Sequence, residues 1–303
     1  PAVRYLRDEL TNSGTPGTET SHYIDLARDL SAINRRLYRQ GRTYHVKRVS
    51  IVSSNTLGAP GGDAGRISIS TAPTSWVMIG AWKRAFDRWN LMNKTAMADA
   101  GNTDVSGAYA DFKVYLSADS RSATLLLPKD NGGNNLTLGE WNYAEIQSPD
   151  GTTGADAFTL HLLGDHVGSA GAWNSVGLAK SYGDARTTVD NDQPNVPTTL
   201  ADDPIANMFD HGTVTDEVLA SLGAENDNAP YSVTLYPGGD NHPKPIVVQQ
   251  TTLGADGRSS VGGFSVMCGV LEFEASSPVA NDVYSVLVEL APGKYRGIAA
   301  DVI

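Results

Sequence analysis

The sequence holds a single cysteine, Cys268, among its 303 residues, so no disulfide can form within the chain. It also lacks any apolar run approaching the ~20 residues that a membrane-spanning helix requires, and we predict no membrane partner. Cys268 lies in the apolar run GGFSVMCGVLEF, which favours a buried small side chain over a reactive thiol. Hydrophobic residues make up 40% of the chain, enough for a large core, which excludes a wholly disordered protein.

Positive charge is also scarce. The chain has 23 Lys and Arg against 34 Asp and Glu, a net charge of −11, which argues against a surface that coats nucleic acid. The basic residues of the first 48 positions nevertheless gather in NRRLYRQGRTYHVKR, as Arg35, Arg36, Arg39, Arg42, Lys47 and Arg48. This cluster indicates either an ordinary solvated helix end or a patch that contacts phosphate or an acidic neighbouring subunit.

Recognisable catalytic and metal-binding motifs are missing as well. The chain has no G-x-S-x-G sequence, and its glycine-rich stretch GAPGGDAG lacks the lysine of a phosphate-binding loop. In HLLGDH, His161 and Asp165 would share one face of a strand while His166 would point the other way, so these side chains do not converge. We therefore predict no enzyme, no metal and no cofactor.

What the sequence does contain is a series of short β segments separated by turns, in keeping with its 31 Gly and 15 Pro. We expect strands within residues 44–55, 66–73, 109–117, 123–128, 140–148, 157–164, 175–182, 231–237, 245–254, 262–276 and 282–303. About a dozen strands fit a mainly β fold, an eight-stranded jelly-roll sandwich with helices in its connections. A compact double jelly roll, which needs about sixteen strands, is the alternative.

Two segments near the start have helical periodicity. In residues 21–41 apolar side chains recur at helical spacing, with Ser21 as a cap and Gly41 as the end, and a further helical segment is expected at 202–224. We predict an N-terminal segment with a helix, residues 1–43, followed by one large domain with long insertions, residues 44–303. We find no linker that would divide the latter.

The second helix, TSWVMIGAWKRAFDRWNLMNK, carries three of the five tryptophans. Trp82, Phe86 and Trp89 recur at steps of four and three residues and form one aromatic stripe, with Trp76 at its start. Lys83, Arg84, Asp87, Arg88 and Lys94 lie mostly off this stripe. We expect a packing helix whose aromatic face lies against something large and flat.

Six phrases, taken in their order and spacing, point to a known family: YIDLARDLSAINRRLYRQGRTYHV, TSWVMIGAWKRAFDRWN, YADFKVYL, GEWNYAEI, YPGGDN and LAPGKYRGI. In these phrases, from about residue 20 to the end, the chain resembles capsid proteins of uncultured small circular single-stranded DNA viruses. The resemblance implies a viral jelly-roll coat protein of the virion, which self-assembles into an icosahedral shell around single-stranded DNA. In similar coats a helix connects the second and third strands, and segment 75–98 is expected there.

One feature departs from that family. Many related coats begin with an arginine-rich arm that gathers the genome, whereas residues 1–20 are mixed and polar here. Genome contact would then fall to the cluster from Arg35 to Arg48, or to weak packing that is mostly not electrostatic. Two other interpretations stay open: a carbohydrate-binding β-sandwich, such as a spike or adhesin module with Trp141 and Trp173 as its platform, and a β-sandwich enzyme with a scattered site.

Overall fold

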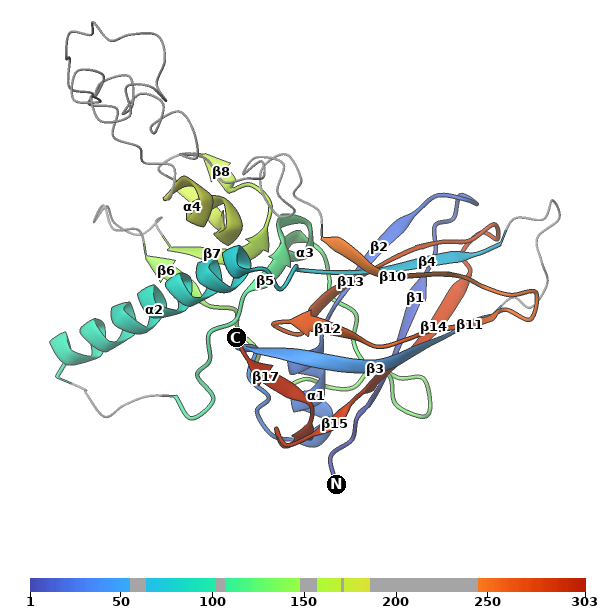
Figure 1. Cartoon of the computed structure of the whole chain (residues 1–303), viewed down its shortest axis with the longest axis horizontal. Coiled ribbons are helices and arrows are strands. Elements are labelled where there is room, and N and C mark those ends of the chain that lie inside the picture. The colour runs from blue at the N-terminus through green and yellow to red at the C-terminus, as the bar shows by residue number, and fades with distance from the viewer. Residues whose placement is uncertain (55–63, 102–106, 148–156, 170–171, 186–244) are drawn as a thin grey trace, which may run out of the picture.

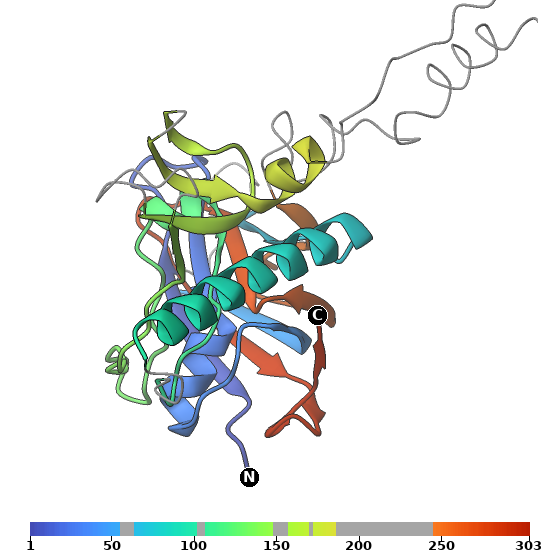
Figure 2. The same ribbon diagram turned by 90° about the vertical axis from the view of Figure 1, so that its left-hand side faces the viewer.

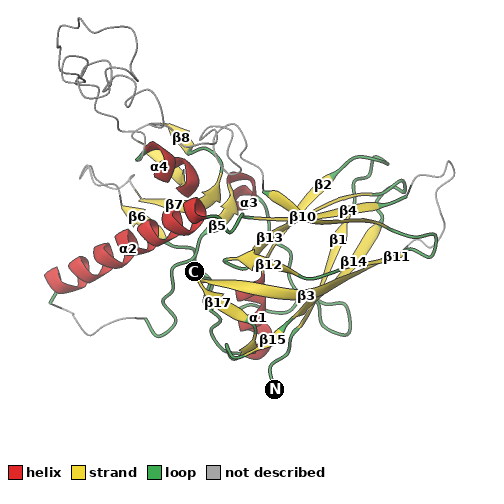
Figure 3. Ribbon diagram, viewed as in Figure 1, coloured by secondary structure: helices red, strands yellow, loops and turns green. Residues whose placement is uncertain are grey.

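The computed structural model describes residues 1–54, 64–101, 107–147, 157–169, 172–185 and 245–303. Strands account for 42% of the structure and helices for 20%, so the predicted mainly β class is confirmed. Figure 3 shows most strands gathered on one side of the molecule and the longest helix on the other. None of the helices within these ranges is both long and apolar enough to cross a lipid bilayer.

One large sheet is built around the longest strand. Its order is β1 (Tyr5–Thr11), β14 (Val283–Leu290), β3 (Arg42–Ser53) and β11 (Arg258–Val261), and every pairing is antiparallel. Two more strands, β12 (Phe264–Met267) and β17 (Ala300–Val302), pair with the first half of β3. The segment predicted at 44–55 is thus the centre of this sheet.

A second antiparallel sheet has the order β10 (Ile246–Thr252), β4 (Arg66–Thr71), β13 (Val270–Ser276) and β2 (Thr20–Asp25). The two sheets curl toward each other into a sandwich (Figure 1). In each sheet strands from the start of the chain pair with strands from its end, as β1 does with β14 and β2 with β13. Early and late β segments therefore share one sandwich.

The main core lies between these sheets. Inward side chains alternate along each strand, as Leu6 and Leu10 do on β1 and Ile67 and Ile69 on β4, because side chains of a strand point to opposite faces in turn. Fully burying one such side chain contributes about 1.5–3 kcal/mol. Helix α1 (Leu26–Asn34) adds Leu26, Ala27 and Leu30 to the same core.

A smaller third sheet lies at one end of the sandwich. It contains β5 (Tyr115–Ser117), β7 (Ala157–Leu163), β9 (Ala172–Gly177) and β8 (Val167–Ser169), and β6 (Glu145–Gln147) also pairs with β7. Two of its pairings, β5 with β7 and β7 with β9, are parallel. Helices α2 (Trp76–Asp99), α3 (Ala118–Ser122) and α4 (Leu178–Asp184) accompany it, and Figure 2 shows α2 lying across the near side of the molecule.

A second hydrophobic cluster joins this part to the sandwich. Met78 and Trp82 of α2 and Leu160 and Leu162 of β7 pack in one cluster with residues at the sandwich end, among them Val270. A short hairpin of β15 (Pro292–Gly293) and β16 (Gly297–Ile298) precedes the final strand.

The prediction for residues 21–41 was wrong in extent. Residues 20–25 form β2, because their backbone pairs with β13, and α1 begins only at Leu26. Asp25 caps this helix by accepting a hydrogen bond from the Arg28 amide at 3.2 Å, and Arg35 ends it in the left-handed conformation. Residues 1–43 therefore supply two sandwich strands besides the helix.

The predicted place of the aromatic helix was also wrong. Helix α1 connects β2 and β3, the second and third strands, whereas α2 lies after β4, in the long connection that leads to β10. Segments 109–117 and 140–148 form strands only at Tyr115–Ser117 and Glu145–Gln147, and 123–128 forms none. Their apolar residues cover core surface instead, as Phe112 and Leu126 do.

Two further predicted strands differ from the structure. Segment 175–182 is strand only to Gly177 and then becomes α4. Segment 262–276 divides into β12 and β13 at a turn in which Cys268 and Gly269 have φ of 60° and 70°. Cys268 is buried as expected. The predicted segments 202–224 and 231–237, and the phrase YPGGDN, lie outside the described residues.

Candidate functional site

The predicted basic cluster divides into two groups in the structure. Arg39 and Arg42 lie beside the C-terminal hairpin, whereas Lys47 and Arg48 lie further along β3. Five residues of strand separate Arg42 from Lys47, about 16 Å. Arg35 and Arg36, at the end of α1, are exposed and form no ion pair within the described ranges.

The first group is organised by a tyrosine that sequence reasoning missed. The Arg42 guanidinium lies 3.7 Å from the centre of the Tyr295 ring, and that of Arg296 lies 5.8 Å from it. The Tyr295 hydroxyl accepts a hydrogen bond from the Arg39 amide at 2.9 Å. We call Arg39, Arg42, Tyr295 and Arg296 the tyrosine–arginine cluster. In the sequence, this cluster was indicated only by the adjacent residues YRG in LAPGKYRGI.

Two contacts hold this cluster in place. The Arg39 guanidinium pairs with Asp111 at 3.2 Å, and burial raises the pKa of that carboxyl despite the nearby Arg39 charge. Gly41 lies against α2: a Cβ at this position would come within 3.0 Å of the Trp82 indole. The loop that carries Arg39 and Arg42 therefore rests on the aromatic helix.

One carboxylate offsets half of the charge of the second group. Lys47 Nζ lies 2.8 Å and Arg48 Nη2 3.4 Å from the two carboxylate oxygens of Glu289, and both cationic side chains are 59% exposed. The hydrogen bond from Lys47 holds the pKa of Glu289 below its usual range. Tyr5 also donates to Glu289, at 3.4 Å. These four residues are among those that line a surface hollow, and together they carry one net positive charge.

Helix α2 packs its aromatic stripe against the subunit, with Trp82 buried and Phe86 and Trp89 partly buried. Trp82 stacks on Phe86 with ring centres 5.3 Å apart and planes inclined by 6°. Phe112 lies among Trp82, Phe86 and Trp89, at 5.6 to 5.8 Å from each ring. Trp76, at the first turn, is 52% exposed and contacts Tyr182 of α4 at 6.5 Å. The surface that receives the stripe is thus the segment around Phe112 together with residues of the third sheet.

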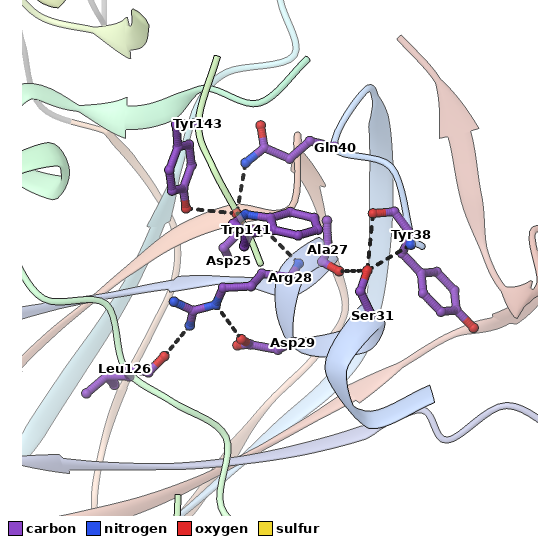
Figure 4. A network of polar contacts seen from close by, with 10 residues as sticks. All are labelled: Asp25, Ala27, Arg28, Asp29, Ser31, Tyr38, Gln40, Leu126, Trp141 and Tyr143. Carbon is purple, nitrogen blue, oxygen red and sulfur yellow. Dashed lines mark hydrogen bonds and ion pairs between the residues drawn. The ribbon is translucent and has the colours of Figure 1, made fainter. Parts of the chain in front are cut away.

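A buried polar network lies where β2 meets α1 (Figure 4). Asp25 is fully buried and accepts hydrogen bonds from Gln40 at 2.9 Å, Tyr143 at 3.0 Å and Trp141 at 3.1 Å, besides the Arg28 amide. Burial raises the pKa of Asp25, and the Arg28 charge and these hydrogen bonds oppose the rise. Asp25 thus joins three separate chain segments.

Two more buried carboxyls surround the same arginine. Arg28 Nε pairs with Asp29 at 2.8 Å, and its Nη2 donates to the Leu126 carbonyl. Asp8 is also fully buried, and neither of its oxygens has a hydrogen-bond partner in the described structure. Burial raises the pKa of Asp8 to about 7, against the opposing charges of Arg28 and Lys129. Burial and the neighbouring Asp8 raise the pKa of Asp29 well above its usual value, against the opposing Arg28 charge.

The residues of HLLGDH do not form a metal site. His161 is buried and bonds Ser175 Oγ and the Asp165 carbonyl, each at 2.7 Å, and burial lowers its pKa to about 4. Asp165 pairs instead with Lys180 at 3.1 Å. Within the described ranges no three His, Cys, Asp or Glu side chains converge on a point that would suit a metal ion. The His161 ring is therefore neutral near pH 7 and is held by two hydrogen bonds within the subunit.

The two tryptophans proposed for a sugar platform are partly exposed, and each also makes a contact within the subunit. The Trp141 indole donates to Asp25, and Lys113 lies 4.6 Å from its ring centre. Trp173 contacts the His166 ring at 4.9 Å.

Comparison with known proteins gave no match: no family model, no curated protein and no solved structure matches this chain.

Proposed function

We propose that this chain is a viral major capsid protein whose sandwich is a jelly roll and which assembles into an icosahedral shell around single-stranded DNA. One observation carries the proposal: the order in which the strands pair. Eight strands can be counted along the sandwich as β1, β2, β3, β4, β10, β11 with β12, β13 and β14. The proposal places the protein in the virion and assigns it no catalysis, metal or cofactor.

The pairing follows a simple rule. The first strand pairs with the eighth, the second with the seventh, the third with the sixth and the fourth with the fifth. A long two-stranded ribbon rolled around itself produces this pattern, and with it the sheet orders 1-8-3-6 and 2-7-4-5. That winding is what defines a jelly roll, the architecture used by many viral coats.

The third sheet favours a single roll over a compact double one. Its strands all fall between the fourth and fifth strands of the sandwich, and two of its pairings are parallel. A second jelly roll would require antiparallel pairs throughout. We interpret the third sheet, α2 and α4 as an insertion in the long connection of one roll.

The tyrosine–arginine cluster supports a contact with DNA at one end of the subunit. Arg35, Arg36 and Arg296 add exposed cations next to Arg39 and Arg42, and guanidinium groups bind phosphate. An aromatic ring among cations is also the arrangement that holds single-stranded bases by stacking. Lys47 and Arg48 contribute less under this proposal, because Glu289 offsets their charge.

The proposal is tested by expressing the chain and imaging the product by negative stain. We expect closed shells some hundreds of ångströms across, as the resemblance to coat proteins implies. Changing Arg35, Arg36 and Arg39 together to alanine should leave shells intact but lower their nucleic-acid content. A monomer that never assembles would reject the coat function, and a triple variant with the parent's DNA content would reject the contact.

A further inference from the structure

A second cationic surface lies on α2, away from the aromatic stripe. Lys83, Arg84, Arg88 and Lys94 are exposed, and Asp87 is the only carboxylate within the same stretch. The resulting net charge of +3 stands out in a chain whose total is −11. We call these four basic residues the basic face of α2.

Helix geometry places all of them on one side. At 3.6 residues per turn, the four cations fall within an arc of about 140°, and Lys83 and Lys94 lie about 16 Å apart along the axis. Trp82, Phe86 and Trp89 occupy the opposite side, where they contact Phe112. Because the stripe packs against the subunit, the basic face points away from it. In Figure 2, α2 lies across the front of the molecule.

The basic face differs from the predicted cluster because its cations have no carboxylate partner in the described structure. Arg39 pairs with Asp111, and Lys47 and Arg48 share Glu289, whereas the four cations of α2 form no ion pair or hydrogen bond from their side chains in the described structure. Neighbouring turns place Arg84 and Arg88 about 6 Å apart along the axis, close to the spacing of successive phosphates in an extended strand.

From this geometry we infer that the basic face of α2 binds the phosphate backbone of single-stranded DNA, as a contact separate from the tyrosine–arginine cluster. The inference rests on the proposed coat function for its biological setting. A second copy of the chain is the competing occupant. Stable subunit interfaces have cores depleted of charge, and between Lys83 and Lys94 the only large apolar side chain within this arc is Leu91, so a polyphosphate fits better.

The test measures binding of a fluorescent 30-nucleotide oligothymidylate to the purified full chain by anisotropy, across a salt series. The variant combines Lys83→Gln, Arg84→Gln, Arg88→Gln and Lys94→Gln. Because each phosphate contact on a single strand contributes about 0.7 to the slope of log K against log salt, the variant's slope should be shallower by about 3. Its affinity at low salt should fall about tenfold or more.

A matched control removes the same number of cations elsewhere: Arg4→Gln, Arg7→Gln, Arg66→Gln and Arg258→Gln. It should change the slope by less than about 1, which separates a local contact from a general effect of net charge. The double variant Arg84→Gln with Arg88→Gln should lose about half of the effect. Equal losses in the control and the quadruple variant would overturn the inference.

Imaging the same variants after nuclease treatment separates this inference from the coat function. If the parent forms shells and the quadruple variant binds DNA as the parent does, the basic face is rejected and the coat function stands. If the parent binds DNA through α2 but forms no shells, the basic face stands and the coat function is rejected. Loss of shells by the quadruple variant alone, with DNA binding retained, would assign α2 to a contact between copies and overturn the inference.

Discussion

Replacing Asp8 with asparagine should change how the stability of this protein depends on pH. Asp8 is buried with no hydrogen-bond partner among the described residues, close to Asp29, Arg28 and Lys129. Its folded-state pKa of about 7 lies above the ordinary value of 3.8. The folded protein therefore retains a proton that the unfolded chain loses, and stability falls as the pH rises from about 4 to about 7.

The size of the effect follows from the width of that window. Each pH unit within it costs about 1.4 kcal/mol, so Asp8 alone accounts for about 4 kcal/mol between the two limits. The asparagine side chain of the Asp8→Asn variant has nearly the same shape as the carboxyl and no charge at any pH. The variant should match the parent near pH 4 and exceed its free energy of unfolding by several kcal/mol at pH 8.

Urea unfolding of both proteins at closely spaced pH values measures this difference. The difference between variant and parent is the right quantity, because His161 acts in the opposite direction on the parent's own curve. Asp87→Asn on the exposed side of α2 is the control and should leave the curve unchanged. Parallel curves for the parent and Asp8→Asn would refute the account of Asp8 as a buried, proton-retaining carboxyl.

Two further predictions concern the second hydrophobic cluster. Trp82→Ala should destabilise the protein by about 3–5 kcal/mol, since it removes a buried ring that contacts Phe86, Phe112 and Gly41. Trp76→Ala should cost much less, because the Trp76 side chain is half-exposed. Equal melting temperatures for the two variants would contradict this prediction. His161→Gln should remove a loss of stability that the parent shows as the pH falls from about 6.5 to about 4, because the buried ring stays neutral there while the unfolded chain takes up a proton. An unchanged acid limb in unfolding experiments would show that His161 is not neutral in the folded state.

The long, regular elements were predictable because local pattern decides them. The alternation in YHVKRVSIVSSN locates β3, and aromatic residues at steps of three and four locate α2 together with its Ser75 cap. Strand β1 was missed, because Asp8 occupies an inward position between Leu6 and Leu10 and breaks the apolar alternation. The same interruption of the pattern could have revealed the buried carboxyl, because it places a charged residue at a core-facing position.

What failed depended on contacts between distant residues. Residues 20–25 have helical spacing, yet they form β2 because β13, almost 250 residues later, offers a strand edge. The basic cluster was found from its composition, but its division was not, because Glu289 and Tyr295 belong to the last strands of the chain. The distant partners of these cations cannot be read from a single sequence.

The central claim is that copies of this β-sandwich subunit close into a shell, and sedimentation velocity of the purified, nuclease-treated chain tests it most directly. We predict one sharp boundary far heavier than the 32.1 kDa subunit, which electron microscopy of the same fraction resolves as closed icosahedral particles. A single boundary at the mass of one subunit, under all conditions of salt and pH at which the chain stays folded, would contradict it.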